Sequence, residues 1–185
     1  MKVKDVLLLV RELLNLPIDV QRCINGETVE EWAEKETNTL LKCFNVVEKE
    51  LAVDYLPLYG EDTIQTNTGS IFYTSLTRKP VRILGIKDGD GTSLKYRIFP
   101  EYIKTECGEI CVRYTYIPEE KLLLDSSDYQ LQASESLLAY GIAVEYCLAR
   151  GRFEEASIWE KKYKQALKLA YKSNPSVVLR TRRWA

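Results

Sequence analysis

Ile110-Cys-Val-Arg-Tyr-Thr-Tyr116 decides the fold, because apolar and polar side chains alternate along it without a break. A period of two is typical of a β-strand that buries one face. The apolar members of this stretch, which would share the buried face, are Ile110, Val112, Tyr114 and Tyr116. The stretch therefore predicts a strand, and a half-buried strand needs neighbours to pair with.

Earlier parts of the chain supply candidate neighbours. Three runs are rich in β-branched and aromatic residues: Ile71–Leu76, Val81–Ile86 and Leu94–Ile98. Asp88-Gly-Asp-Gly91 separates the second run from the third, and Cys107-Gly108 precedes the last strand, both at positions where a hairpin needs positive φ. Because turns this short cannot hold a parallel crossover, we expect an antiparallel meander of about four to six strands over residues 60–118.

Helical patterns precede the strands. Lys2–Leu16 places its apolar residues on one helical face until Pro17 ends the pattern, and a polar connector, Asp19–Glu27, follows. Thr28-Val-Glu-Glu31 matches a capping box, in which the threonine oxygen accepts a hydrogen bond from the Glu31 N–H. A second amphipathic helix is predicted from there to about Val53.

Two more helices are predicted after the strands. Asp125-Ser-Ser-Asp128 carries side chains able to cap a helix, and the apolar period indicates a helix over about Ala133–Arg150. Gly141 inside it costs about 1 kcal/mol relative to alanine, which we interpret as close approach of a neighbouring helix. Gly151 is expected just past the helix end, and a last helix from Phe153 to about Tyr171 completes a tight antiparallel hairpin.

Together these patterns predict an α+β fold. The N- and C-terminal helices form a helical bundle, an antiparallel β-sheet is inserted between them, and an extended tail follows. One domain with an insert suits a chain of 185 residues. We place the N-terminal helices in residues 1–56, the inserted β domain in 57–120, the helical hairpin in 121–174 and the docking tail in 175–185.

Charge is unevenly distributed along the chain, although the formal net charge is only -1. Eight of the 26 basic residues follow Glu160, the last acidic residue, so residues 161–185 carry +8. The first 160 residues hold the other 18 basic and all 27 acidic residues, which gives -9. Such a split suggests a partner for the basic end.

Most hydrolytic chemistry is excluded because the chain has no histidine. Adjacent carboxylates, such as Glu30/Glu31 and Glu154/Glu155, do not face each other on a helix and so form no acid–base dyad. Neither phosphate-loop pattern, GxxxxGK[ST] or GxGxxG, occurs. We therefore expect a protein that is not an enzyme and holds no cofactor.

Two segments resemble metal sites without completing one. Asp88-Gly-Asp-Gly91 resembles a calcium loop, but Phe99 stands where the bidentate glutamate would fall, and a hairpin turn is favoured. Cys107-x3-Cys111 lacks the second pair or histidine of a zinc site. The odd number of cysteines, five, indicates reduced, mostly buried cytosolic thiols. Val6–Val10 is too short to span a membrane, so we expect no metal and no membrane partner.

The chain ends in an alternating basic and apolar segment, Ser173–Ala185. Three uses are open for it: binding nucleic acid phosphates, acting as a solubilising tail, or docking into a partner protein with Trp184 as an apolar anchor. We favour docking, because arginine and tryptophan are enriched in interface hot spots. The candidate contact residues are Val177, Leu179, Arg180, Arg182, Arg183 and Trp184.

The C-terminal third resembles the head–tail connector proteins of tailed bacteriophages, the adaptor or head-completion subunits also found in prophages. The resemblance lies in the run from Leu138 to Gly151, in Phe153-Glu-Glu-Ala156 with Trp159, and in the closing Arg180-Thr-Arg-Arg-Trp184. In the front half, the layout of Asn45-Val-Val-Glu48, Asp54-Tyr-Leu-Pro57 and Lys79-Pro-Val-Arg82 is similar to the same group.

The resemblance implies a structural virion protein of the phage neck, made in the bacterial cytoplasm. Such subunits form a homo-oligomeric ring, typically twelvefold, beneath the portal protein, and they continue the DNA channel towards the tail. It would place residues 177–185 in portal docking and the β insert against neighbours or the next neck or tail protein. Genomic DNA would pass through the channel without being gripped, which suits the acidic first 160 residues.

Rival functions differ in class. The nearest is another neck subunit, a stopper or tail-completion protein. A second is a nucleic-acid-binding regulator that uses the basic tail, which salt-dependent DNA binding would reveal. A third is a small-molecule enzyme built on carboxylates, which would need a deep pocket with pKa-perturbed acids.

Overall fold

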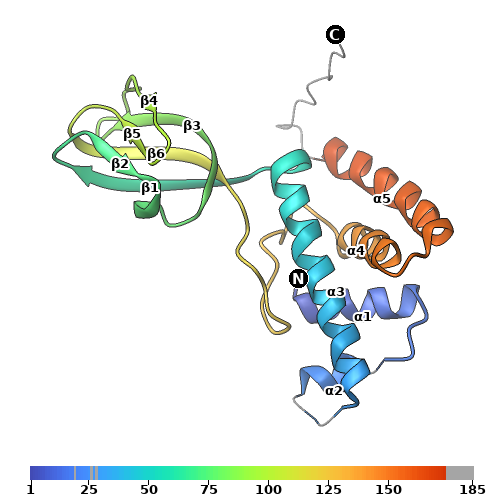
Figure 1. The fold of residues 1–185 in the computed structure, drawn as a ribbon. Helices are drawn as coiled ribbons and strands as arrows, with labels where there is room; N and C mark the ends of the chain where they lie inside the picture. Colours follow the sequence, from blue (N-terminus) through green and yellow to red (C-terminus); the bar gives the residue numbers. More distant parts are fainter. Residues whose placement is uncertain (19, 26, 28, 174–185) are drawn as a thin grey trace. The chain divides into compact units, whose positions relative to one another are not determined.

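The alternating run Ile110–Tyr116 lies in β6 (Gly108–Tyr116), as predicted (Figure 1). The computed structural model describes residues 1–18, 20–25, 27 and 29–173. β6 is the central strand of a three-stranded sheet, between β1 (Leu58–Thr66) and β3 (Pro80–Asp88). Both neighbours pair with it antiparallel, and β1 does so along its full length, from Leu58 opposite Tyr116 to Thr66 opposite Gly108.

A second antiparallel sheet has three shorter strands. β5 (Tyr102–Lys104) lies between β2 (Ser70–Phe72) and β4 (Arg97–Ile98). Strands of both sheets contribute to one apolar core, which holds the inserted β region together. Its buried members are Ile71, Leu76, Ile86, Ile103, Ile110, Val112 and Tyr114.

The strand order contradicts the predicted meander. In a meander each strand pairs with its sequence neighbour, whereas here the last strand, β6, lies between β1 and β3. The predicted strand Ile71–Leu76 ends at Phe72 and continues as a 3-10 turn, Tyr73–Ser75. Of the predicted strand Leu94–Ile98, only Arg97–Ile98 is a strand, β4. Turn signals report pairing between neighbours in sequence, so they could not indicate that β6 pairs with a strand more than 40 residues away.

The hairpin turn predicted at Asp88–Gly91 is confirmed, whereas Cys107-Gly108 forms no hairpin, because β5 and β6 belong to different sheets. Asp88 Oδ1 accepts hydrogen bonds from the N–H of Asp90 (3.1 Å) and of Thr92 (2.7 Å), which closes the turn after β3. Gly91 in this turn has φ of 83°, and Gly108 at the start of β6 has φ of 133°. Both values lie in the region that glycine adopts without steric cost.

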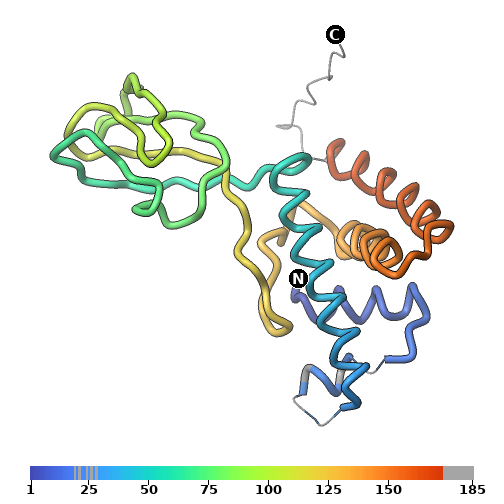
Figure 2. The backbone as a smooth tube through the Cα atoms, in the orientation of Figure 1, coloured from blue at the N-terminus to red at the C-terminus, as the bar shows by residue number. Residues whose placement is uncertain are grey.

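The other unit of the chain is helical. Its long helices are α1 (Val3–Leu13), α3 (Glu31–Glu50), α4 (Glu135–Ala149) and α5 (Phe153–Ser173). α4 packs against α1, α3 and α5, and its apolar residues are buried almost all round, as in a central helix (Figure 2). α3 continues directly into a π-helical turn, Leu51–Tyr55.

Three predicted helix boundaries are corrected by the structure. The polar connector contains a short helix, α2 (Val20–Ile24). α3 begins at Glu31, where Glu30 O accepts from the N–H of Ala33 and Glu34, and Thr28 lies outside the described residues. The cap of α4 is Ser134, whose Oγ accepts from the Leu137 N–H, so Asp125-Ser-Ser-Asp128 does not cap it.

Gly141 marks a close helix contact, as predicted. A Cβ added at this position would lie 2.8 Å from Val47 Cγ1 on α3 and 3.0 Å from Tyr163 Cε2 on α5. No side chain fits in that space without moving its neighbours. Gly151, with φ of 69°, ends α4 and turns the chain into α5.

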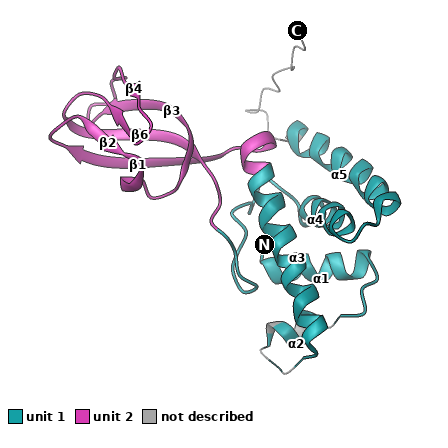
Figure 3. Cartoon of the chain, viewed as in Figure 1, with its two compact units in different colours: residues 1–50, 120–185 teal, residues 51–119 magenta. Residues whose placement is uncertain are grey.

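The protein is α+β, and its contacts divide it into two compact units (Figure 3). Residues 1–50 and 120–185 form the helical unit, while residues 51–119 form the β unit between them in sequence. The predicted extended tail, residues 175–185, lies outside the described residues.

Candidate interaction surfaces

The predicted docking residues cannot be placed against any surface. Val177, Leu179, Arg180, Arg182, Arg183 and Trp184 all lie outside the described residues. The described part of the chain presents three other surfaces that expose apolar or charged side chains together. Two belong to the helical unit and one to the β unit.

The first surface is a segment without regular structure that leads into α4, residues 120–134, which we call the strap. Its start is fixed to α3 by one asparagine side chain. Asn45 Oδ1 accepts from the Lys121 N–H (2.7 Å), and Asn45 Nδ2 donates to the Lys121 carbonyl (3.1 Å). A single amide thus satisfies both backbone groups of Lys121, which replaces the pairing that a strand or helix would provide.

A buried carboxylate fixes the middle of the strap. Glu48 on α3 is only 1% exposed, and its Oε1 accepts from Ser127 Oγ and from the Asp128 N–H (3.1 Å). Lys121 Nζ and Asp128 Oδ1 form an ion pair beside it at 2.6 Å. Burial raises the pKa of Glu48 above its usual value, against the hydrogen bond from Ser127 and the charge of Lys121. The cluster is therefore a structural anchor in which the acid is held towards its neutral form.

The chain start is bound to the same strap. The Val3 N–H donates to the Asp125 carbonyl (3.0 Å), and the Ser127 N–H donates to the Met1 carbonyl (3.2 Å). Gln130 reinforces this contact, because its Nε2 donates to the Ser127 carbonyl (2.6 Å) while its Oε1 accepts from the terminal amine. Hydrogen bonds from α3 and from the N-terminus together hold the strap in one conformation.

Despite this anchoring, the strap exposes large apolar side chains. Leu122 is 68% exposed, Leu124 is 67% exposed and Leu131 is 98% exposed. Three leucines on one ordered segment are unusual for a surface that stays in water, because each forfeits the free energy of burial. The strap therefore has the character of a contact surface.

The second surface is the outer face of α5. Its inner face, with Ala156, Tyr163 and Leu167, is buried. On the opposite side Ile158 is 56% exposed and Leu169 is 67% exposed. These two residues are eleven positions apart, three helical turns, so they lie on one stripe of the helix. Exposed lysines flank the stripe at positions 161, 162, 168 and 172.

Lys162 also stabilises the junction of α4 and α5. Its Nζ lies 4.3 Å from the centroid of the Trp159 ring and 5.9 Å from that of Tyr140. The two rings stack on each other at 5.9 Å. The cation thus lies over an aromatic pair and adds a cation–π attraction between the two helices.

The third surface is the outer face of the sheet β2-β5-β4. Ile103 points into the core, so its neighbours Tyr102 and Lys104 point outward. Tyr102 stacks on Phe99 at 4.8 Å and lies 5.8 Å from Phe72, which is 53% exposed. The face thus presents a cluster of aromatic rings.

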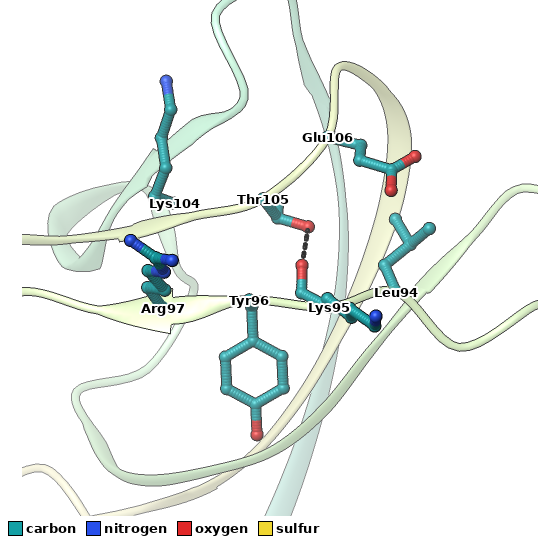
Figure 4. Close-up of a pocket in the computed structure, with 7 residues that line it drawn as sticks. All are labelled: Leu94, Lys95, Tyr96, Arg97, Lys104, Thr105 and Glu106. Atoms are coloured by element: carbon teal, nitrogen blue, oxygen red, sulfur yellow. Dashed lines mark hydrogen bonds between the residues drawn. The ribbon is translucent and has the colours of Figure 1, made fainter.

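Cations adjoin these rings. Arg97 is directly opposite Lys104 in the pairing of β4 with β5, and like charges in this position destabilise a sheet. Both line a shallow groove of about 670 Å³ together with Lys95, Tyr96 and Glu106. Figure 4 shows that Tyr96 points away from the side on which Lys104 and Arg97 lie, while Thr105 Oγ1 donates to the Lys95 carbonyl (3.2 Å). The groove suits an anionic partner.

Catalytic or metal chemistry has little support in the described residues. Within residues 1–18, 20–25, 27 and 29–173 no three histidine, cysteine, aspartate or glutamate side chains gather as metal ligands. All five cysteines are free, as predicted, but only Cys43 and Cys147 are buried, and Cys107 is exposed. Burial raises the pKa of the Cys43 thiol to about 11, which leaves almost no thiolate at neutral pH.

Sequence reasoning missed all three surfaces for an identifiable reason. The run Leu122-Leu-Leu124 is visible in the sequence, but its exposure follows only from the anchoring by Asn45 and Glu48, which lie 76 and 80 residues before the strap residues they bind. The aromatic cluster depends on the pairing of Phe72 with Tyr102, which no turn signal indicates. The lysines of α5 can be recognised in the sequence as a run of positive charge. Which apolar residues of α5 are exposed beside them depends on how the helix packs.

Comparison with known proteins adds no family. No protein-family model matches the chain, and no curated protein matches it significantly. Among the described residues, no helix combines the length and apolar character needed to cross a membrane.

Proposed function

We propose that the protein is a structural subunit of a bacteriophage or prophage neck, an adaptor that assembles as a ring and joins the portal to the tail. The observation that carries the proposal is the exposure of apolar side chains on ordered elements of both units. Leu124 on the strap, Leu169 on α5 and Phe72 on β2 are each more than half exposed. Side chains of this kind are expected where a subunit meets several neighbours.

The chemistry of the described residues supports an assembly role over catalysis. Glu48, the most deeply buried carboxylate, is used to hold the strap, and its partners are a serine hydroxyl and a backbone N–H. The buried thiols of Cys43 and Cys147 have raised pKa values because of burial, which makes them poor nucleophiles. The resemblance of the helical hairpin to connector proteins points to the same class.

Residues 177–185 reach the portal in this proposal. Trp184 supplies an apolar anchor, while Arg180, Arg182 and Arg183 pair with carboxylates of the portal. The β unit contacts neighbouring subunits or the next neck protein. The assembled ring lies in the virion at the portal vertex.

Co-sedimentation with the portal protein of the same phage genome tests the proposal. The full chain should sediment with the portal, and a chain ending at Asn174 should remain folded by circular dichroism but lose the portal. Trp184→Ala in the full chain tests the apolar anchor alone, because it keeps every charge, and it should weaken binding at least tenfold. If the truncated chain bound the portal as well as the full chain does, residues 175–185 would not be the portal-docking segment.

A second candidate function, nucleic-acid binding, is favoured by one observation. The outer sheet face combines the aromatic rings of Phe72, Phe99 and Tyr102 with Arg97 and Lys104, and proteins that bind single strands use aromatic stacking with a basic groove. Fluorescence anisotropy with a labelled single-stranded oligonucleotide would detect it. Binding that falls steeply with salt and is lost in Phe72→Ala would favour this function over the structural one.

A further inference from the structure

We propose that the strap of one copy packs against the outer face of α5 in the next copy, and that repetition of this contact builds the oligomer. The inference rests on the proposed function, since an adaptor must associate with itself. The two surfaces are both apolar, and charges of opposite sign adjoin them. All the residues it uses lie in the helical unit.

The strap has the properties of a preformed binding surface. Asn45, Glu48 and the N-terminal backbone fix its conformation, so little conformational entropy is lost when a partner binds. Leu122 and Leu124 nevertheless remain about two-thirds exposed, although Leu123 between them is partly buried and lines a cavity with Thr37 and Asn38 of α3. The exposed pair is thus presented by a segment that cannot turn inward.

α5 offers a complementary apolar stripe. Ile158 and Leu169 lie on the side of the helix opposite to the buried Tyr163 and Leu167, and Gln165 stands between them on the same stripe. A helix that exposes apolar residues at positions i and i+11 presents a contact about three turns long. Leu122 and Leu124, two residues apart, span at most about 7 Å and so cover one end of this stripe, which is about 16 Å long, while its other end faces the residues that flank them.

The charges around the two surfaces are opposite in sign. The strap and the start of α4 expose the carboxylates of Asp125 and Glu135, while Glu120 beside them is paired with Lys49 of α3. Beyond Glu154, which lies one turn before Ile158, the α5 stripe is bordered by Lys161, Lys168 and Lys172, and the sequence holds no acidic residue after Glu160. When the strap of one copy meets α5 of another, acidic and basic side chains therefore lie close together. This favours the contact of strap with α5 over a contact between two straps or between two α5 helices.

The two surfaces lie on opposite sides of the helical unit and cannot meet within one copy. The strap is bound to α3, whereas the outer face of α5 points away from α4, on which the inner face of α5 packs (Figure 1). A contact between two different surfaces is heterologous, and it leaves a free strap at one end of a dimer and a free α5 face at the other. Repetition then adds further copies until a ring closes.

The test uses two variants, each of which destroys one surface. Leu122→Asp/Leu124→Asp removes the strap contact, and Ile158→Asp/Leu169→Asp removes the α5 contact. All four side chains are exposed, so the monomer should fold, which circular dichroism checks. Leu148→Asp, at an exposed position of α4 outside both surfaces, is the matched control. Association is measured by analytical ultracentrifugation at low salt, up to about 1 mM protein, where interactions of millimolar Kd are detectable.

The wild-type chain and the Leu148→Asp control should form higher oligomers, and each double variant alone should associate at least tenfold more weakly. Mixed together, the two variants should form a dimer and nothing larger, because only one intact strap and one intact α5 face remain. Raised salt should weaken association of the wild type. A wild-type chain that stays monomeric under these conditions, or variants that assemble like it, would overturn the inference.

The experiments distinguish an error in the proposed contact between strap and α5 from an error in the proposed adaptor role. Variants that assemble normally and still sediment with the portal would disprove the strap contact and leave the proposed function standing. A wild-type chain that assembles through these surfaces but never binds portal would disprove the adaptor role and retain the interface.

Discussion

Glu48 is 1% exposed and has one carboxylate oxygen that accepts two hydrogen bonds and one that accepts none from the described residues. Asp128 Oδ2 is in the same situation, and the charge of Asp128 adds to the rise in the pKa of Glu48. A buried acid in this position costs stability when it ionises and contributes stability when it is protonated. The strap is therefore held by Glu48, and the stability of the folded chain depends on whether this side chain is protonated.

The substitution Glu48→Gln tests the role of this charge state. Because the folded-state pKa of Glu48 is raised above 4.5, the folded chain binds the proton more tightly than the unfolded chain. The free energy of unfolding should then fall as pH rises from 4.5 towards the folded-state pKa, with a slope of about 1.4 kcal/mol per pH unit, and level off above it. Glu48→Gln cannot titrate and should lose this slope in urea unfolding measured across that range.

The control for this substitution is Glu48→Ala, which removes the acceptor of Ser127 Oγ and of the Asp128 N–H and should cost about 2–4 kcal/mol near pH 4.5, and less above the folded-state pKa, where the wild type has itself lost stability. A slope that persists unchanged in Glu48→Gln would assign the pH dependence to another group.

Gly141 supports a second prediction at the scale of one residue. Alanine is normally about 1 kcal/mol better than glycine inside a helix, but a Cβ here would lie 2.8 Å from Val47 Cγ1. Overpacking should outweigh propensity, so Gly141→Ala should destabilise the protein by about 1–3 kcal/mol in urea unfolding. In a Val47→Ala background the same substitution should cost clearly less, because the contacting methyl is gone. Equal costs in the two backgrounds would show that the close contact does not matter.

Secondary-structure elements were predictable where the pattern is local and strong. β6 alternates over its whole length, α5 carries a clear apolar period, and α4 is a long apolar run that Gly151 ends. β1 is polar along most of its length, and its conformation follows from pairing with β6, so it was missed. The predicted cap of α4 was wrong because the candidate side chains have other partners. Ser127 donates to Glu48, and Asp128 accepts from Lys121.

The β4–β5 pair yields a prediction at the scale of elements. Arg97 lies directly opposite Lys104, so Arg97→Glu replaces a repulsive pair by an attractive one and should stabilise the β unit by roughly 0.2–1 kcal/mol. The gain should shrink at high salt, because both side chains are exposed.

Thermal unfolding at low and high salt measures this effect. Arg82→Glu is the control, since Arg82 is equally exposed but lies opposite Thr115 and should give little change. Equal shifts in the two variants would contradict the role of the cross-strand pair.

The molecule as a whole combines an acidic first part with a basic end, a split that the net charge of -1 conceals. The sequence indicated that the basic end has a partner, and the described residues add where further contacts are presented: the strap, the outer face of α5 and the sheet β2-β5-β4. None of these surfaces follows from composition, because each depends on which side chains the packed elements leave exposed. The tail itself, residues 175–185, lies outside the described residues.

Electron microscopy of the portal protein incubated with this chain tests the central claim most directly. The adaptor role predicts an additional ring stacked on one end of the portal, coaxial with its channel, that appears with the full chain and is absent with the chain ending at Asn174. Portal particles that look the same with and without the full chain would contradict it.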